Sequence, residues 1–187
     1  GRVEAGGTAA EQLAAMGVLP EDLELVLAMS LDCDHVSALS EFAGARRLLA
    51  AEEEIWWSYR TNPNHCTRLY DSLPLETYYF RGYGNLGPDG RSYDVFGDGS
   101  VVCVSTPGHT KGTVAVKISS GGNFALLCSE NGCARRSWEN MDMPGLAFNK
   151  AALKKSLEWI RRESSLPGCA AALASHDPDV RPGMIEI

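Results

Sequence analysis

Side chains of the types that bind metals follow four short apolar runs in this chain, and this repetition constrains the fold more than any other feature. The runs and the residues that follow them are "LELVLAM" with His35, "VVCVSTPG" with His109, "FALLCS" with Glu130 and "AAALAS" with His176. Such runs are typical of buried strands, and α/β folds bring the residues after their strands to one edge, where ligands bind. A lone histidine after a strand is more often structural, but three of the four histidines share this placement. We therefore expect the four positions to converge.

The rest of the chain predicts a mixture of helices and strands in one α/β domain, residues 1–187. "TAAEQLAAMG" predicts a short helix with Thr8 as its N-cap and Gly17 as its end. "VSALSEFAGA" predicts a helix start, and residues 60–95, which show little periodicity, predict a loop-rich cover. Further along the chain we expect a strand and a helix in "RRLLAAEEEIWWSYRTN" and a hairpin turn at "FGDGS". We expect a sheet from "SVVCVST", "TVAVKI" and "NFALLCS". The chain then predicts a helix in "NKAALKKSLEWIRRES" and a last strand in "CAAALAS".

Composition limits the partners. Twenty-four acidic against seventeen basic residues give a net charge of −7, which argues against nucleic-acid and anionic-membrane partners. The small-molecule substrate that we expect comes from the family resemblance given below. No apolar run approaches the ~20 residues that span a bilayer. The six cysteines lack CxxC pairing, and several lie in apolar strands, so we expect a reducing, cytoplasmic compartment. A homodimer face at Trp56 and Trp57 is compatible with the sequence, as is simple packing of these side chains.

The segment "SLDCDH" places Asp32, Asp34 and His35 within four positions. Neutral imidazole and carboxylate groups are good ligands for zinc, iron or manganese, whereas a polar turn would explain the same residues without a metal. On a loop, the adjacent Asp34 and His35 can both point one way, as they could not in a regular strand. Gly108 and Gly112 free the backbone around His109 to turn sharply.

The motifs resemble, in order and spacing, those of the metallo-β-lactamase superfamily. The segments concerned are "LVLAMSLDCDHVSAL", "VVCVSTPGHTKGTVAV", "FALLCSENG" and "AALASHDPD". Among its branches, "SENGCARRSWENM" and the segments that follow it look most like the N-acyl homoserine lactonase group. The resemblance implies an α/β (α+β) fold of the αββα sandwich type with a two-metal centre that activates a water. It also implies strands ahead of the motif, so the domain is expected to be incomplete at its N-terminus.

The resemblance carries over to single residues unevenly. Asp34, His35 and His176 match ligands of the second metal position, Glu130 stands in place of the bridging Asp, and His109 matches a ligand of the first position. Asp32 replaces a histidine of the motif and can still bind a metal. Ser30 replaces another histidine and is a poor ligand, while Cys133 replaces a tyrosine that polarises the substrate carbonyl. We therefore expect one firmly held ion, a second that is loose or absent, and metal ligands drawn from Asp32, Asp34, His35, His109, Glu130 and His176.

The function implied by the resemblance is metal-dependent hydrolysis of a lactone or related carboxylic ester, with zinc expected and iron or manganese compatible. Asp34 and Asp32 are the candidate catalytic residues, because either can accept a proton from the attacking water or hold that water in line. The alternative is a degenerate family member with a partial metal site and no hydrolase activity. Ser30 and Cys133 favour that alternative.

Overall fold

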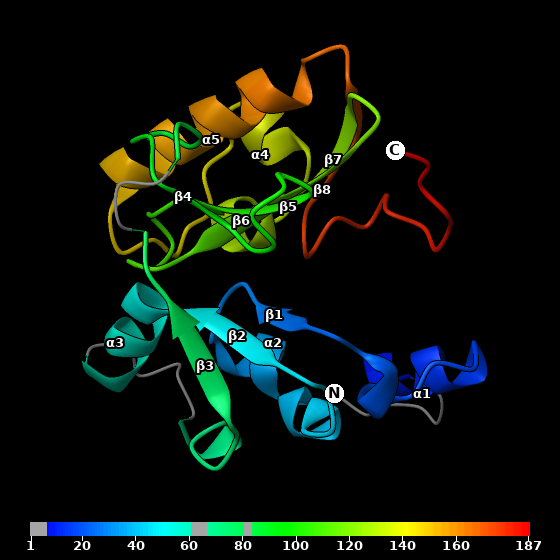
Figure 1. Cartoon of the computed structure of the whole chain (residues 1–187). Coiled ribbons are helices and arrows are strands. Elements are labelled where there is room, and N and C mark those ends of the chain that lie inside the picture. The colour runs from blue at the N-terminus through cyan, green and yellow to red at the C-terminus, as the bar shows by residue number, and fades with distance from the viewer. Residues whose placement is uncertain (1–6, 61–66, 81–83) are drawn as a thin grey trace. The chain divides into compact units, whose positions relative to one another are not determined.

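The computed structural model describes residues 7–60, 67–80 and 84–187, and the chain divides into two compact units (Figure 1). Unit 1 is Gly1–Tyr78 and unit 2 is Tyr79–Ile187. His65 and Cys66 lie outside the described residues. In the part of the chain that the structure describes, no helix has the length and apolarity needed to cross a membrane. The division into two compact units does not test the expected single domain, which therefore stays a prediction.

Unit 1 is built on a small parallel sheet in the order β1-β2-β3, in which β2 is completely buried. Leu48, at the start of β2, belongs to the apolar core of this unit together with Leu31, Val36 and Leu39. The α-helices and strands of unit 1 are α1 (Ala9–Ala15), β1 (Val26–Ala28), α2 (Cys33–Val36), β2 (Leu48–Ala51), α3 (Glu52–Arg60) and β3 (Leu75–Tyr78), with short 3-10 turns at Pro20–Asp22 (η1), Leu39–Phe42 (η2) and Thr67–Leu69 (η3).

Unit 2 is built on a five-stranded sheet in the order β4-β5-β6-β7-β8, in which only β7 and β8 pair in parallel. Helices α4 and α5 cover one face of this sheet (Figure 1), and Leu153, Leu157 and Ile160 of α5 are fully buried against it. The elements are β4 (Ser92–Asp94), β5 (Val101–Ser105), β6 (Val114–Ser120), β7 (Asn123–Leu127), η4 (Ser129–Asn131), α4 (Arg136–Glu139), α5 (Lys150–Ser164) and β8 (Cys169–Leu173).

Most predicted elements are confirmed. Thr8 and Glu11 form a capping box at α1, and Gly17 follows the helix with φ +79°. Asn149 caps α5 by accepting the backbone N–H of Ala152 at 3.0 Å. The predicted strands and the hairpin between β4 and β5 are all present, with Gly97 and Gly99 at positive φ in the turn.

Two expectations need correction. The loop-rich cover predicted for residues 60–95 contains β3, which pairs in parallel with the buried β2, and β4 at the edge of the larger sheet. Both strands are only three or four residues long, which is too short to show periodicity. The helix predicted to start after His35 is replaced by the end of α2, which covers Cys33–Val36, and by the 3-10 turn η2. Asp34 and His35 therefore lie within α2 and not on a loop.

Candidate metal centre

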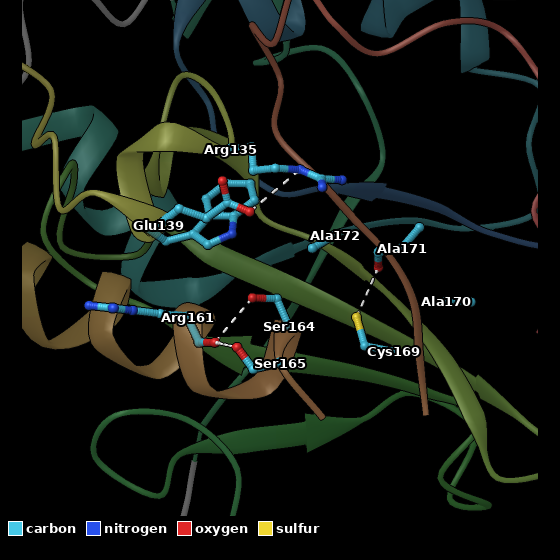
Figure 2. A pocket seen from close by; sticks show the side chains of 10 residues that line it. Arg135, Glu139, Arg161, Ser164, Ser165, Cys169, Ala170, Ala171 and Ala172 are labelled. Carbon is cyan, nitrogen blue, oxygen red and sulfur yellow. Dashed lines mark hydrogen bonds and ion pairs between the residues drawn. The ribbon is translucent and has the colours of Figure 1, made fainter. Parts of the chain in front are cut away.

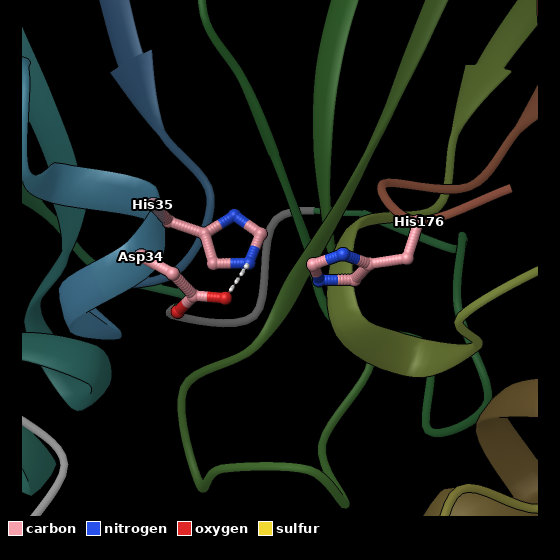
Figure 3. Close-up of side chains that lie close together, drawn as sticks. All are labelled: Asp34, His35 and His176. Carbon is pink, nitrogen blue, oxygen red and sulfur yellow. Dashed lines mark ion pairs between the residues drawn. The ribbon is translucent and has the colours of Figure 1, made fainter. Parts of the chain in front are cut away.

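The candidate ligands of unit 1 lie at the start of a short helix directly after β1. Asp32 is the N-cap of α2, where its backbone oxygen accepts the N–H groups of His35 at 2.9 Å and Val36 at 3.1 Å. Within the helix, Asp34 Oδ2 lies 3.7 Å from His35 Nε2 (Figure 3). A single turn of helix thus brings a carboxylate and an imidazole to one place, which a regular strand would separate onto opposite faces.

Ser30 and Glu54 shape the segment that carries these ligands. The Ser30 hydroxyl accepts the backbone N–H of Asp32 at 3.2 Å, so this side chain supports the turn into α2. Glu54 of α3 is completely buried, and its Oε1 accepts the backbone N–H of Leu31 at 3.0 Å. A buried backbone N–H needs such a partner, so Glu54 holds the ligand segment from the side of α3.

In unit 2, the loop that carries His109 is clamped against helix α5. Gly108 has φ +148°, and a Cβ at this position would lie 2.3 Å from Leu153 Cα. Ser156 Oγ donates to the backbone oxygen of Pro107 at 2.8 Å, and the Phe148 N–H donates to the backbone oxygen of His109 at 3.1 Å. Helix α5 therefore fixes the backbone around His109, and the glycine is required by a close approach as well as by its φ.

Glu130 lies in η4, directly after β7, and is buried with 7% of its surface exposed. The preceding residue, Ser129, has φ +52°, an uncommon left-handed conformation for a residue other than glycine. Glu130 Oε1 lies 3.1 Å from His176 Nε2, so the residues after β7 and β8 meet as predicted. Neighbouring strands of unit 2 thus bring a buried carboxylate and an imidazole together.

The spacing and chemistry of both pairs fit a divalent cation. Zinc bonds of about 2.0–2.2 Å in tetrahedral geometry place two ligand atoms roughly 3.4 Å apart. The pair on unit 2 at 3.1 Å and the pair on unit 1 at 3.7 Å bracket this separation. The candidate ligands are divided between the units, with Asp32, Asp34 and His35 on unit 1 and His109, Glu130 and His176 on unit 2.

Asp177 anchors the turn that carries His176. Its carboxylate accepts the backbone N–H of Arg135 at 2.8 Å and that of Asp179 at 3.0 Å. These two hydrogen bonds hold the pKa of Asp177 below its usual range. Asp177 therefore ties the turn after β8 to the segment before α4, and acts on His176 through the backbone.

Cys133, which follows η4, is within electrostatic reach of Glu130. Partial burial, and then the negative charge of Glu130, raise the pKa of the Cys133 thiol. A neutral thiol is a weaker hydrogen-bond donor than the phenol that the lactonase resemblance implies at this position. Cys133 therefore lacks the means to polarise a carbonyl as a tyrosine would.

Sequence reasoning missed the residues that hold the ligand segments. Glu54 is the clearest case, because "EEE" at the start of a helix is typical of solvated side chains near the helix N-terminus. Helical spacing does place Glu54 on the same buried face as Trp57 and Ser58, which is a signal that could have identified it. Ser156 gives no such signal, because its partner at Pro107 is 49 residues away.

A pocket of about 400 Å³ in unit 2 is separate from these ligands (Figure 2). It lies between α4, the end of α5 and strand β8, and its polar lining includes Arg135, Glu139 and Arg161. Arg135 Nε and Glu139 Oε1 lie 4.0 Å apart, while the hydroxyls of Ser164 and Ser165 both donate to the backbone oxygen of Arg161. None of the candidate metal ligands in the described part of the chain lines this pocket.

Comparison with solved structures identifies the fold. The chain matches an N-acyl homoserine lactone hydrolase, solved with N-hexanoyl-L-homoserine bound at its catalytic metal centre, with a TM-score of 0.74 at 16% identity. The match covers 94% of this chain and 64% of that one. AidC, a dizinc quorum-quenching lactonase, matches with a TM-score of 0.67 at 15% identity over 92% of this chain and 64% of its own. The chain has the metallo-β-lactamase fold. The predicted fold class is confirmed.

Sequence comparison agrees with this assignment. The N-acyl homoserine lactonase AttM of Rhizobium radiobacter is 24% identical over 176 residues, which cover 90% of this chain and 64% of the lactonase. A probable metallo-hydrolase of Mycobacterium tuberculosis is 27% identical over 135 residues, covering 66% of this chain and 41% of that protein. No protein-family model matches the sequence. The predicted resemblance to lactonases of the superfamily is confirmed. This metallo-β-lactamase-fold chain spans less than two thirds of the length of these relatives.

Proposed function

We propose that this metallo-β-lactamase-fold chain binds a divalent cation, zinc in the first place, and hydrolyses a lactone or a related carboxylic ester. One observation carries the proposal: Glu130 and His176, which follow neighbouring strands of unit 2, lie 3.1 Å apart, at the spacing of two ligands on one ion. The similarity to AttM along 90% of the chain supports the lactone as substrate class.

The resemblance to the metallo-β-lactamase superfamily supports a specific set of ligands for the cation. Asp34, His35, Glu130 and His176 are proposed as the residues that would hold a firmly bound ion, and Asp32 and His109 as residues that would hold a weaker one. The dizinc centre named for AidC supports zinc, and iron and manganese use the same ligand types. Bound there, a divalent cation would lower the pKa of a coordinated water and polarise the substrate carbonyl.

The protein's own groups would supply the remaining chemistry. Asp34, with its side chain 60% exposed, is placed to accept a proton from the attacking water. The buried Asp32 would orient that water through its carboxylate. Glu130 and His176 would fix the position of the reacting centre on unit 2. Ser129 directly precedes Glu130 and has a left-handed backbone conformation, and Asp177 directly follows His176 and accepts the backbone N–H of Arg135. Cys133 gives no strong donor to the carbonyl, which predicts slower turnover than a site with a tyrosine there.

We also propose a substrate class and a cellular compartment for this chain. A small-molecule substrate is supported by the product named for the lactone hydrolase of known structure. Cys103 in β5 and Cys128 after β7 are fully buried, and burial raises the pKa of the Cys128 thiol, which supports a chain that keeps its cysteines reduced. We propose a cytoplasmic setting on that basis.

A second candidate function is a metal-free or single-metal relative without hydrolase activity. The observation that favours it is the Ser30 hydroxyl, which supports the backbone of Asp32 in place of the motif's first histidine. This alternative predicts at most one ion per chain and no metal-dependent turnover.

Hydrolysis of a lactone, ester and thioester panel by the purified, zinc-loaded chain tests the proposal. We expect lactone opening that a chelator abolishes and zinc restores, followed by titration of the released acid. The exposed acid Glu158 offers a matched control, since Glu158→Ala should leave turnover unchanged while Glu130→Ala removes it. Bound zinc without turnover would favour the second candidate, and absence of bound zinc would refute the metal site as well.

A further inference from the structure

Asn131, the residue after Glu130, makes a hydrogen bond that joins two candidate ligand loops. Its Nδ2 donates to Thr106 Oγ1 at 2.8 Å and to the backbone oxygen of Cys128 at 2.9 Å. Asn131 and Thr106 are both 0% exposed, so water cannot replace these bonds. The two side chains are 25 residues apart in sequence and join the segment after β7 to the segment after β5.

The chemistry of the contact requires an amide. The Cys128 oxygen is an acceptor only, so the side chain must present its NH₂ group to it, and the amide orientation is fixed. An aspartate would place acceptor against acceptor, and an alanine would leave the Thr106 hydroxyl and the Cys128 oxygen without this donor. Among the described residues, Asn131 Oδ1 has no hydrogen-bond partner although it is buried. Burying this oxygen without a partner costs free energy, and the same amide orientation is what places the NH₂ group against its two acceptors.

The bridge ends on a closed loop that holds His109. The Thr106 N–H donates to the backbone oxygen of Thr113 at 3.0 Å, and the hydroxyls of Thr110 and Thr113 lie 2.7 Å apart. The hydroxyl of Thr106 also faces the Thr113 oxygen at 3.4 Å, so it accepts from Asn131 while donating along the loop. Polar groups that are all buried form one network from Asn131 to both sides of His109.

The other end of the bridge fixes Glu130. Glu130 lies between Ser129, with its left-handed φ of 52°, and Asn131, whose side chain is bonded twice. A residue in that conformation persists only where its surroundings determine it. We infer that Asn131 is a positioning residue that sets Glu130 and the His109 loop at a fixed separation for a shared divalent cation. This inference rests on the proposed metal site.

Cobalt binding to the whole chain tests this role, because Co²⁺ uses the same ligand types as zinc and its visible absorption reports ligand geometry. Asn131→Ala and Thr106→Val should each weaken Co²⁺ binding about 10-fold, as loss of groups that orient ligands does, and should shift the absorption bands. Thr106→Ser keeps the accepting oxygen and should retain affinity and spectrum. The matched control is Ser137→Ala, which removes another buried hydroxyl and should lower the melting temperature without moving the spectrum.

Hydrogen exchange of the metal-free chain tests the hydrogen bond between Asn131 and Thr106 separately from the proposed metal site. In Asn131→Ala or Thr106→Val, residues 106–113 should exchange faster than in the parent chain. Failure of the parent chain to bind Co²⁺ would refute the proposed metal site, and unchanged exchange over 106–113 would refute the bridge. An unchanged Co²⁺ spectrum and affinity in both variants, with only a lower melting temperature, would reduce Asn131 to a stabilising residue and overturn the inference.

Discussion

The two units present their candidate metal ligands in contrasting ways. Unit 1 places Asp32, Asp34 and His35 within four consecutive residues, at the start of a short helix after one strand. Unit 2 places His109, Glu130 and His176 on three separate segments, after β5, β7 and β8. A local motif needs only one turn of helix to form its pair, whereas the unit 2 pair exists only after the five-stranded sheet has formed. Substitutions in the sheet of unit 2 should therefore disturb the candidate site more than substitutions around α2.

Gly108→Ala should give the largest effect on stability. The new Cβ would lie 2.3 Å from Leu153 Cα at a φ of +148°, so the His109 loop must leave α5 or the helix must shift. We expect a loss of about 3 kcal/mol from overpacking and backbone strain together, measured by urea unfolding. Gly121→Ala is the control, because its φ is +56° with open space around it, and strain alone should cost about 1–2 kcal/mol. Equal losses in the two variants would contradict a clamp by α5.

Glu54→Ala tests the support of the unit 1 segment. It removes the buried acceptor of the Leu31 N–H, and we expect a loss of about 2 kcal/mol in the free energy of unfolding. Glu54→Gln keeps an acceptor oxygen of the same reach and should lose less than about 1 kcal/mol. If the two variants were equally destabilised, the carboxylate would act through its charge and not through this hydrogen bond.

How much of the fold and site the sequence predicted depends on whether a feature is set by neighbouring residues or by contacts between distant ones. Apolar runs, caps and turn glycines were enough to locate β1, the hairpin after β4 and helix α5, because each depends on neighbouring residues. The meeting of Glu130 with His176 was expected because each follows an apolar run that predicts a strand. The bridge from Asn131 to Thr106 could not be predicted, because nothing local distinguishes a buried amide in "ENG" from a turn residue.

Alkylation of Cys133 should show the smallest effect, and it tests the electrostatics of η4. The pKa of this thiol is raised by burial and by the charge of Glu130. Removing the charge in Glu130→Gln should lower that pKa, increase the thiolate fraction at neutral pH and speed alkylation by a few-fold. Mass spectrometry of the peptide that contains Cys133 gives the rate, and Glu139→Gln serves as the control. A rate that is unchanged in Glu130→Gln would contradict the coupling.

Zinc affinity in three variants tests most directly the proposal that this chain binds a cation through Glu130 and His176, whose side chains lie 3.1 Å apart on unit 2. Competition with a chelating dye should give one firmly bound zinc per parent chain. Glu130→Ala and His176→Ala should each weaken that zinc by about 100-fold, and the double variant should lose little more, because either removal already breaks the pair of ligands. Zinc affinity that survives in one of the single variants, or a parent chain that binds no zinc, would contradict the account.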